Sequence, residues 1–95
     1  MAKFEINKDV FFQRSYILTE ATHALTMMAL SGHGHCILAN YTYCIQLTVY
    51  SKSANEAQVN YEHLNELLHD NWQGEIQDFT EDDPQFWITR FTYHF

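Results

Sequence analysis

The segment Tyr41–Val49 constrains the fold more than any other part of the chain, because its residues alternate strictly in character. One set of alternate positions comprises Tyr41, Tyr43, Ile45, Leu47 and Val49, and the other comprises Thr42, Cys44, Gln46 and Thr48. Successive side chains of a β-strand point to opposite faces, so this pattern predicts a strand with one apolar and one more polar face. A sheet with one apolar face needs a layer of helices to cover it.

Two segments have the helical period expected of such a layer. Between Asp9 and Leu30 apolar residues recur at steps of three and four, and Gly32 follows as a left-handed stop. The second helix begins at a capping box, in which Ser53 is the N-cap residue and Glu56 stands three positions later. We expect it to end near Trp72–Gly74. Its predicted buried side chains are Ala57, Tyr61, Leu64, Leu67 and Leu68.

Further strands are expected to complete the sheet. They are Lys3–Asn7, Gly34–Leu38, an edge strand over Glu75–Phe79, and a C-terminal strand over Gln85–Phe95, with a tight turn at Ala39–Asn40. The predicted order is β-α-β-β-α-(β)-β. We therefore expect a single domain over residues 1–95 of the α+β class, with an antiparallel sheet and two helices on one face, compatible with a ferredoxin-like arrangement. That fold hosts many unrelated functions, so function has to be argued from particular residues.

Charge is distributed unevenly along the chain, whose net charge is −7. The segment from Ser53 to Thr89 holds nine of the 12 acidic residues and no Lys or Arg, so it carries −9 and the remainder carries +2. We expect no direct binding to nucleic acid or to an anionic membrane, since both need a basic surface. Eight of these acidic residues are candidate partner-binding residues, namely Glu62, Glu66, Asp70, Glu75, Asp78, Glu81, Asp82 and Asp83.

Three of these carboxylates, at Glu62, Glu66 and Asp70, have the i, i+4, i+8 spacing that places them on one stripe of the second helix. Like charges at this spacing destabilise a helix by a few tenths of a kcal/mol, and no Lys lies among them. Two interpretations stay open at this point. The acidic residues form a solvated surface that maintains solubility, or they form a negative surface that steers the protein onto a basic partner.

A second candidate site lies around the run HGHC, which contains His33, His35 and Cys36, with His23 upstream. Imidazole and thiolate are ligands that zinc prefers, so these four residues are alternative candidate metal ligands. The runs EATHAL and HGH also resemble the zinc-ligand pattern of the 6-pyruvoyl-tetrahydropterin synthase family, and VNYEHL is similar to another of its motifs. The resemblance implies a zinc-dependent lyase-type enzyme. It requires Thr19–Leu25 to be a strand, whereas the period of these residues is helical.

Other enzyme signatures are absent from the sequence, which has no glycine-rich phosphate loop, no G-x-S-x-G and no H-E-x-x-H motif. We therefore favour a non-enzymatic protein that needs no cofactor and binds another protein. A small acidic chain of this kind suits an inhibitor that mimics nucleic acid and occupies a basic nucleic-acid-binding groove. Phage-encoded anti-CRISPR and anti-restriction proteins have this profile.

The compartment and the assembly state follow less directly. No apolar run is long enough to span a bilayer, and the first residues contain no apolar segment of a secretory signal. We expect a cytoplasmic protein, in the host cytoplasm if it is viral, whose Cys36 and Cys44 are reduced. A dimer is compatible with the sequence.

Overall fold

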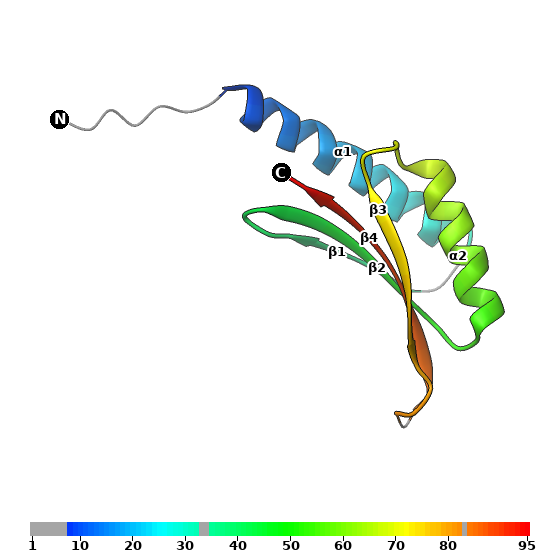
Figure 1. Cartoon of the computed structure of the whole chain (residues 1–95). Helices are drawn as coiled ribbons and strands as arrows, with labels where there is room; N and C mark the ends of the chain where they lie inside the picture. The colour runs from blue at the N-terminus through cyan, green and yellow to red at the C-terminus, as the bar shows by residue number, and fades with distance from the viewer. Residues whose placement is uncertain (1–7, 33–34, 83) are drawn as a thin grey trace.

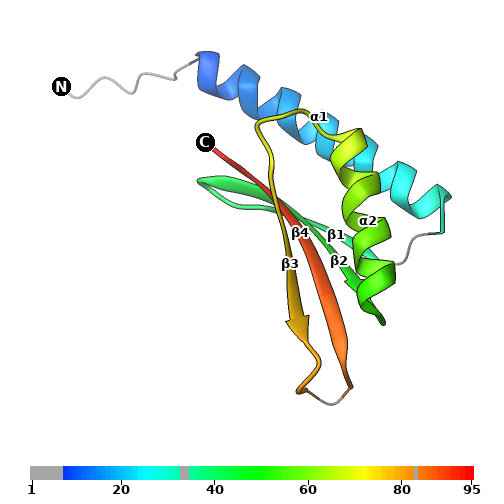
Figure 2. The ribbon, with the colours of Figure 1, turned by 45° about the vertical axis from the view of Figure 1, so that its right-hand side comes forward.

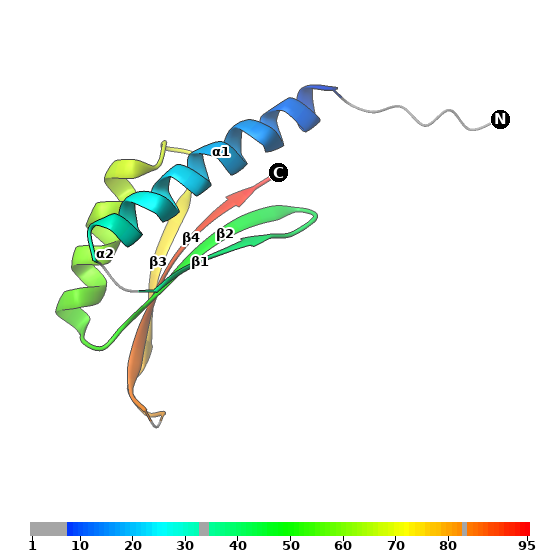
Figure 3. The same ribbon diagram turned by 180° about the vertical axis from the view of Figure 1, so that it is seen from behind.

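The computed structural model describes residues 8–32, 35–82 and 84–95, with the side chains of residues 8–12 excepted. Within these residues the order of elements is α1 (Lys8–Leu30), β1 (Cys36–Asn40), β2 (Cys44–Ser51), α2 (Ala54–Leu67), β3 (Gln73–Phe79) and β4 (Phe86–His94). The strands form one antiparallel sheet in the order β1-β2-β4-β3. Both helices pack on the same face of this sheet (Figures 1 and 3). The predicted α+β class is confirmed.

The core lies between the helices and the sheet. Alternate side chains of β2 form the part of the core that the sheet contributes. Ile45, Leu47 and Val49 are fully buried beneath the helices. Phe91 on β4 is opposite Leu47 and continues the same apolar row. The helices contribute Ala21, Ala24 and Met28 from α1 and Leu64 and Leu68 from the α2 region. Neither described helix lies over the other face of the sheet (Figures 1 and 3).

The predicted glycine stop after α1 and the predicted Ser53 cap of α2 are both present. Gly32 follows α1 with a φ of 70°, the left-handed conformation that glycine adopts without steric cost. Ser53 caps α2, because its Oγ accepts a hydrogen bond from the backbone N–H of Glu56 at 3.1 Å. The Glu56 carboxylate accepts from the backbone N–H of Lys52 at 3.0 Å, one residue before the N-cap, so Ser53 satisfies a donor of the helix and Glu56 holds the residue that leads into it.

Helix α2 ends earlier than the sequence predicts, at Leu67 rather than near Trp72–Gly74. Leu68 already has an extended backbone, and its N–H donates to the carbonyl of Leu64. Trp72 explains the early end, because its ring packs 5.6 Å from that of Tyr93 and its indole N–H donates to the Glu20 carboxylate on α1. These contacts draw the chain back to the sheet, where β3 begins.

The β1–β2 turn also differs from expectation, because it spans residues 41–43 and not Ala39–Asn40. The Arg14 guanidinium of α1 holds this turn by donating to Asn40 Oδ1 and to the Tyr41 carbonyl, both at 2.9 Å, and to the Thr42 carbonyl. Arg14 also lies 4.1 Å from the centre of the Phe95 ring. Tyr41 therefore lies in the turn, 55% exposed, and not on the apolar face.

The strand register separates the two cysteines. Cys36 is opposite Val49, and Cys44 is opposite His94. The predicted strand Lys3–Asn7 lies outside the described residues. In a ferredoxin-like sheet that first strand would lie in the interior of the sheet, whereas here β2 and β4 are direct neighbours. The described sheet therefore shares the helix layer of that arrangement but not the pairing at its centre.

Candidate functional site

Seven of the eight candidate carboxylates lie in the described part of the chain, and all seven are exposed; Asp83 lies outside it. We call these seven the acidic surface. They follow one another along α2, the connection to β3, β3 itself and the β3–β4 turn, and they are Glu62, Glu66, Asp70, Glu75, Asp78, Glu81 and Asp82. The β3–β4 hairpin extends past the beginning of α2, so the surface reaches the tip of the molecule (Figure 2).

The helical part of the acidic surface contains two of the three residues expected there. Glu62 and Glu66 lie on the exposed side of α2, while Leu64 between them points into the core. Glu62 accepts a hydrogen bond from the Gln58 side chain at 3.3 Å. Asp70 is exposed but follows the end of α2 at Leu67, so the predicted three-residue helical stripe is wrong in its last member. The early end of the helix is the physical reason.

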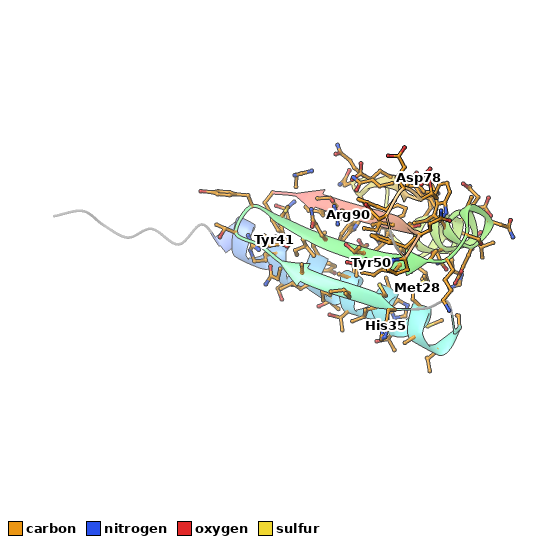
Figure 4. The ribbon with its side chains drawn as sticks, turned by 90° about the horizontal axis from the view of Figure 1, so that it is seen from below. Met28, His35, Tyr41, Tyr50, Asp78 and Arg90 are labelled. Carbon is orange, nitrogen blue, oxygen red and sulfur yellow. The ribbon has the colours of Figure 1, made fainter. Side chains whose placement is uncertain are left out.

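The strand part of the acidic surface continues around the edge formed by β3. Glu75 is opposite Arg90 on the face that the helices leave uncovered. Asp78 is opposite Trp87, on the face that carries α2, and its carboxylate accepts from the backbone N–H of Thr80 at 2.7 Å. The acidic surface therefore wraps around one edge of the sheet and is not a single flat face. Asp78 and His35 lie toward opposite edges (Figure 4).

No Lys or Arg side chain in the described part of the chain lies within 4 Å of any of the seven carboxylates. Arg14 is bound to the β1–β2 turn. Arg90 donates through Nε to Thr48 Oγ1 at 3.2 Å, although Glu75 is its cross-strand neighbour. Lys52 is exposed at the start of α2. A surface that maintains solubility normally mixes charges of both signs, so the lack of counter-ions here distinguishes the acidic surface.

The three candidate metal ligands that the structure describes, His23, His35 and Cys36, do not form a metal-binding group. His33 lies outside the described residues. His23 is exposed on α1, so the EATHAL run is helical and not the strand that the pterin-synthase pattern requires. Cys36 is opposite Val49 on the helix-covered face, whereas His35 directly before it pairs with Tyr50 through a 3.4 Å backbone hydrogen bond. Adjacent residues of an extended chain point to opposite faces.

Cys36 is also a poor metal ligand for a chemical reason. Burial raises the pKa of its thiol to about 11, so forming the thiolate that metals bind costs more here than at an exposed thiol. Across residues 8–32, 35–82 and 84–95, no three His, Cys, Asp or Glu side chains form a group able to hold a metal ion.

The sequence did not indicate one further feature, a cavity of about 530 Å³ at the start of α2. Its lining comes from the residues before β1, the end of β2, the start of α2 and the start of β4. Tyr50 and Phe86 are its aromatic residues, with ring centres 6.0 Å apart. We call it the aromatic cavity. Because four separate segments form it, the only sequence signal was the outward position of Tyr50 in the alternating strand.

Comparisons of this chain with known protein families, with curated proteins and with solved structures found no match. Neither described helix combines the length and the apolar character needed to cross a membrane.

Proposed function

We propose that this protein is a non-enzymatic binder that places its acidic surface against a basic, nucleic-acid-binding surface of another protein. The observation that supports the proposal is the state of the seven carboxylates: all are exposed, and none has a Lys or Arg counter-ion within 4 Å in the described part of the chain. Uncompensated charges of one sign produce a long-range field that accelerates encounter with an oppositely charged surface. A basic groove that holds nucleic acid offers such a surface.

The shape of the acidic surface supports a groove rather than a flat partner. The carboxylates wrap around the β3 edge to the hairpin tip. A body with charge around one edge can enter a groove and meet basic side chains on both walls. We place the protein among the acidic inhibitors that phages direct at host nucleases, acting in the host cytoplasm. The free thiols of Cys36 and Cys44 fit that reducing compartment.

The proposal is tested by capture and competition. The immobilised protein is expected to retain from a host lysate one basic protein that is released by high salt and that loses binding when its own nucleic acid is added. A captured protein that binds equally well with its nucleic acid in place would contradict occupation of the groove.

A matched pair of variants assigns the interaction to the acidic surface. Glu62→Lys with Glu66→Lys and Glu5→Lys with Asp9→Lys each change the net charge from −7 to −3. Only the first pair alters the acidic surface, so we expect it alone to weaken capture strongly at low salt. Equal losses in both variants would show that net charge, and not this surface, governs binding.

A further inference from the structure

The aromatic cavity combines π surfaces with a fixed carboxylate. Tyr50 lies on the uncovered face of β2 and is 43% exposed. Phe79 stacks on the Phe86 ring, with centres 4.8 Å apart and planes 9° apart, and so holds in place a ring that lines the cavity. Pro84 adds a further apolar wall.

Three titratable or charged side chains line the cavity, namely His35, Lys52 and Glu56. They differ in how firmly they are held. One oxygen of the Glu56 carboxylate accepts from the Lys52 backbone N–H at 3.0 Å, which fixes the negative charge at the cavity. The Lys52 ammonium sits at the end of an exposed, flexible stem and can turn toward solvent. The cavity therefore has a fixed negative group and a movable positive one.

Aromatic rings beside a carboxylate are chemically suited to a planar cation. A cation over the face of an aromatic ring is attracted by the quadrupole of that ring, and Arg occupies this position more often than Lys. Guanidinium also stacks flat on rings and is less strongly hydrated than ammonium. Glu81 and Asp82 lie in the turn that leads to Pro84, so the field around the cavity favours a cation as well.

We propose that the aromatic cavity receives an arginine side chain of the partner protein, with the guanidinium against Tyr50 and Phe86 and paired with Glu56. This inference rests on the proposed function, because a basic nucleic-acid-binding surface supplies the arginine. It adds a specific contact to an interaction that the acidic surface alone would make only by charge.

The test uses the protein alone with small probes, so that its outcome is separate from that of the capture experiment. The ring signals of Tyr50 and Phe86 are followed by NMR during titration with N-acetyl-arginine amide. We expect saturable shifts, with binding of the uncharged N-acetyl-citrulline amide about two- to fivefold weaker, the factor that a cation–π contact contributes at an exposed site. Equal binding of the citrulline probe, or no shift of either ring with the arginine probe, would overturn the inference.

Two variants of the cavity are expected to change the affinity for the arginine probe in opposite directions, which a non-specific effect would not do. Glu56→Gln keeps the capping box but removes the charge, and should weaken arginine binding. Lys52→Gln removes the competing cation and should strengthen it. Tyr50→Leu should abolish it, whereas Tyr43→Leu, in the distant β1–β2 turn, should leave it unchanged. Stronger binding of N-acetyl-aspartate amide, with the effects of Glu56→Gln and Lys52→Gln reversed, would show that the cavity selects an anion.

Discussion

Replacing Gly74 with alanine is expected to destabilise the protein by about 1–3 kcal/mol, the usual cost of overpacking a core. A Cβ at this position would lie 2.6 Å from two carbons of the Phe91 ring and 2.7 Å from a ring carbon of Tyr61. The Phe91 ring cannot retreat, because Phe91 is only 1% exposed and its ring packs against that of the half-buried Tyr61, with centres 5.0 Å apart. Gly74 thus leaves the space that Tyr61 of α2 and Phe91 of β4 occupy.

The sign of this change makes the test informative. Glycine within a strand is otherwise unfavourable by roughly 0.5–1 kcal/mol relative to alanine, so local propensity alone predicts stabilisation. Urea unfolding followed by circular dichroism should instead show a lower free energy of unfolding, with Tm reduced by about 4–8 °C per kcal/mol.

Two controls separate the overlap with the rings from a general effect on β3. Gln73→Ala, on the uncovered face, should change the free energy of unfolding little, since surface substitutions usually stay within about 0.5 kcal/mol. Gly74→Ala combined with Phe91→Leu should cost less than the sum of the single changes, because a smaller side chain makes room for the Cβ. A Gly74→Ala protein as stable as the wild type would refute the reasoning.

Three further predictions concern the core, the turn and a thiol. Leu64→Ala should lower the free energy of unfolding by about 2–5 kcal/mol, since Leu64 is fully buried, and a loss below about 1 kcal/mol in urea unfolding would mean that α2 does not anchor the core. Arg14→Lys should accelerate amide exchange at Tyr41 and lower Tm, because a single ammonium cannot serve the carbonyls and Asn40 together; unchanged exchange would show that the turn holds itself. In a Cys44→Ser protein, iodoacetamide should modify folded Cys36 slowly at pH 8 and faster as pH approaches about 11, and the rate profile of a free thiol would contradict burial. Because folding raises this pKa from 9.0, the stabilisation that Cys36 contributes is complete below pH 9 and is lost between pH 9 and about 11.

Local patterns predicted the parts of the fold that local physics determines. The alternation placed Ile45, Leu47 and Val49 in the core, and each is fully buried. The capping box at Ser53 fixed the start of α2, because its hydrogen bonds lie within four residues of sequence. Both signals depend only on residues that are close together in the chain, so they can be predicted from the sequence alone.

The end of α2 and the β1–β2 turn were predicted at the wrong positions, because contacts between residues distant in the chain determine them. Helix α2 stops at Leu67 because Trp72 packs on Tyr93 and donates to Glu20, both far away along the chain. The β1–β2 turn lies at residues 41–43, where Arg14 of α1 binds its carbonyls. No pattern within these segments indicates such partners.

In the candidate sites, too, some features were predictable from local sequence and others depended on long-range contacts. Exposure of the carboxylates followed from their charge, whereas the departure of Asp70 from the helical stripe followed from the long-range end of α2. Cys36 and His35 were adjacent candidates in sequence, yet the strand directs the Cys36 side chain into the core. The aromatic cavity needed the folded chain, because four segments contribute to it.

The dependence of the association rate on salt tests the role of the acidic surface most directly, with the captured protein as the partner. The wild-type rate should fall steeply between 0.01 M and 0.1 M salt, as the Debye length shrinks from about 30 Å to about 10 Å. Glu62→Lys with Glu66→Lys should slow association by roughly tenfold or more at low salt and approach the wild-type rate at high salt, since electrostatic steering contributes about 10- to 1,000-fold. Glu5→Lys with Asp9→Lys, which has the same net charge of −3, should have a much smaller effect. If both variants slow association equally, or if the wild-type rate is independent of salt, the carboxylates are a solvated surface and not a binding surface.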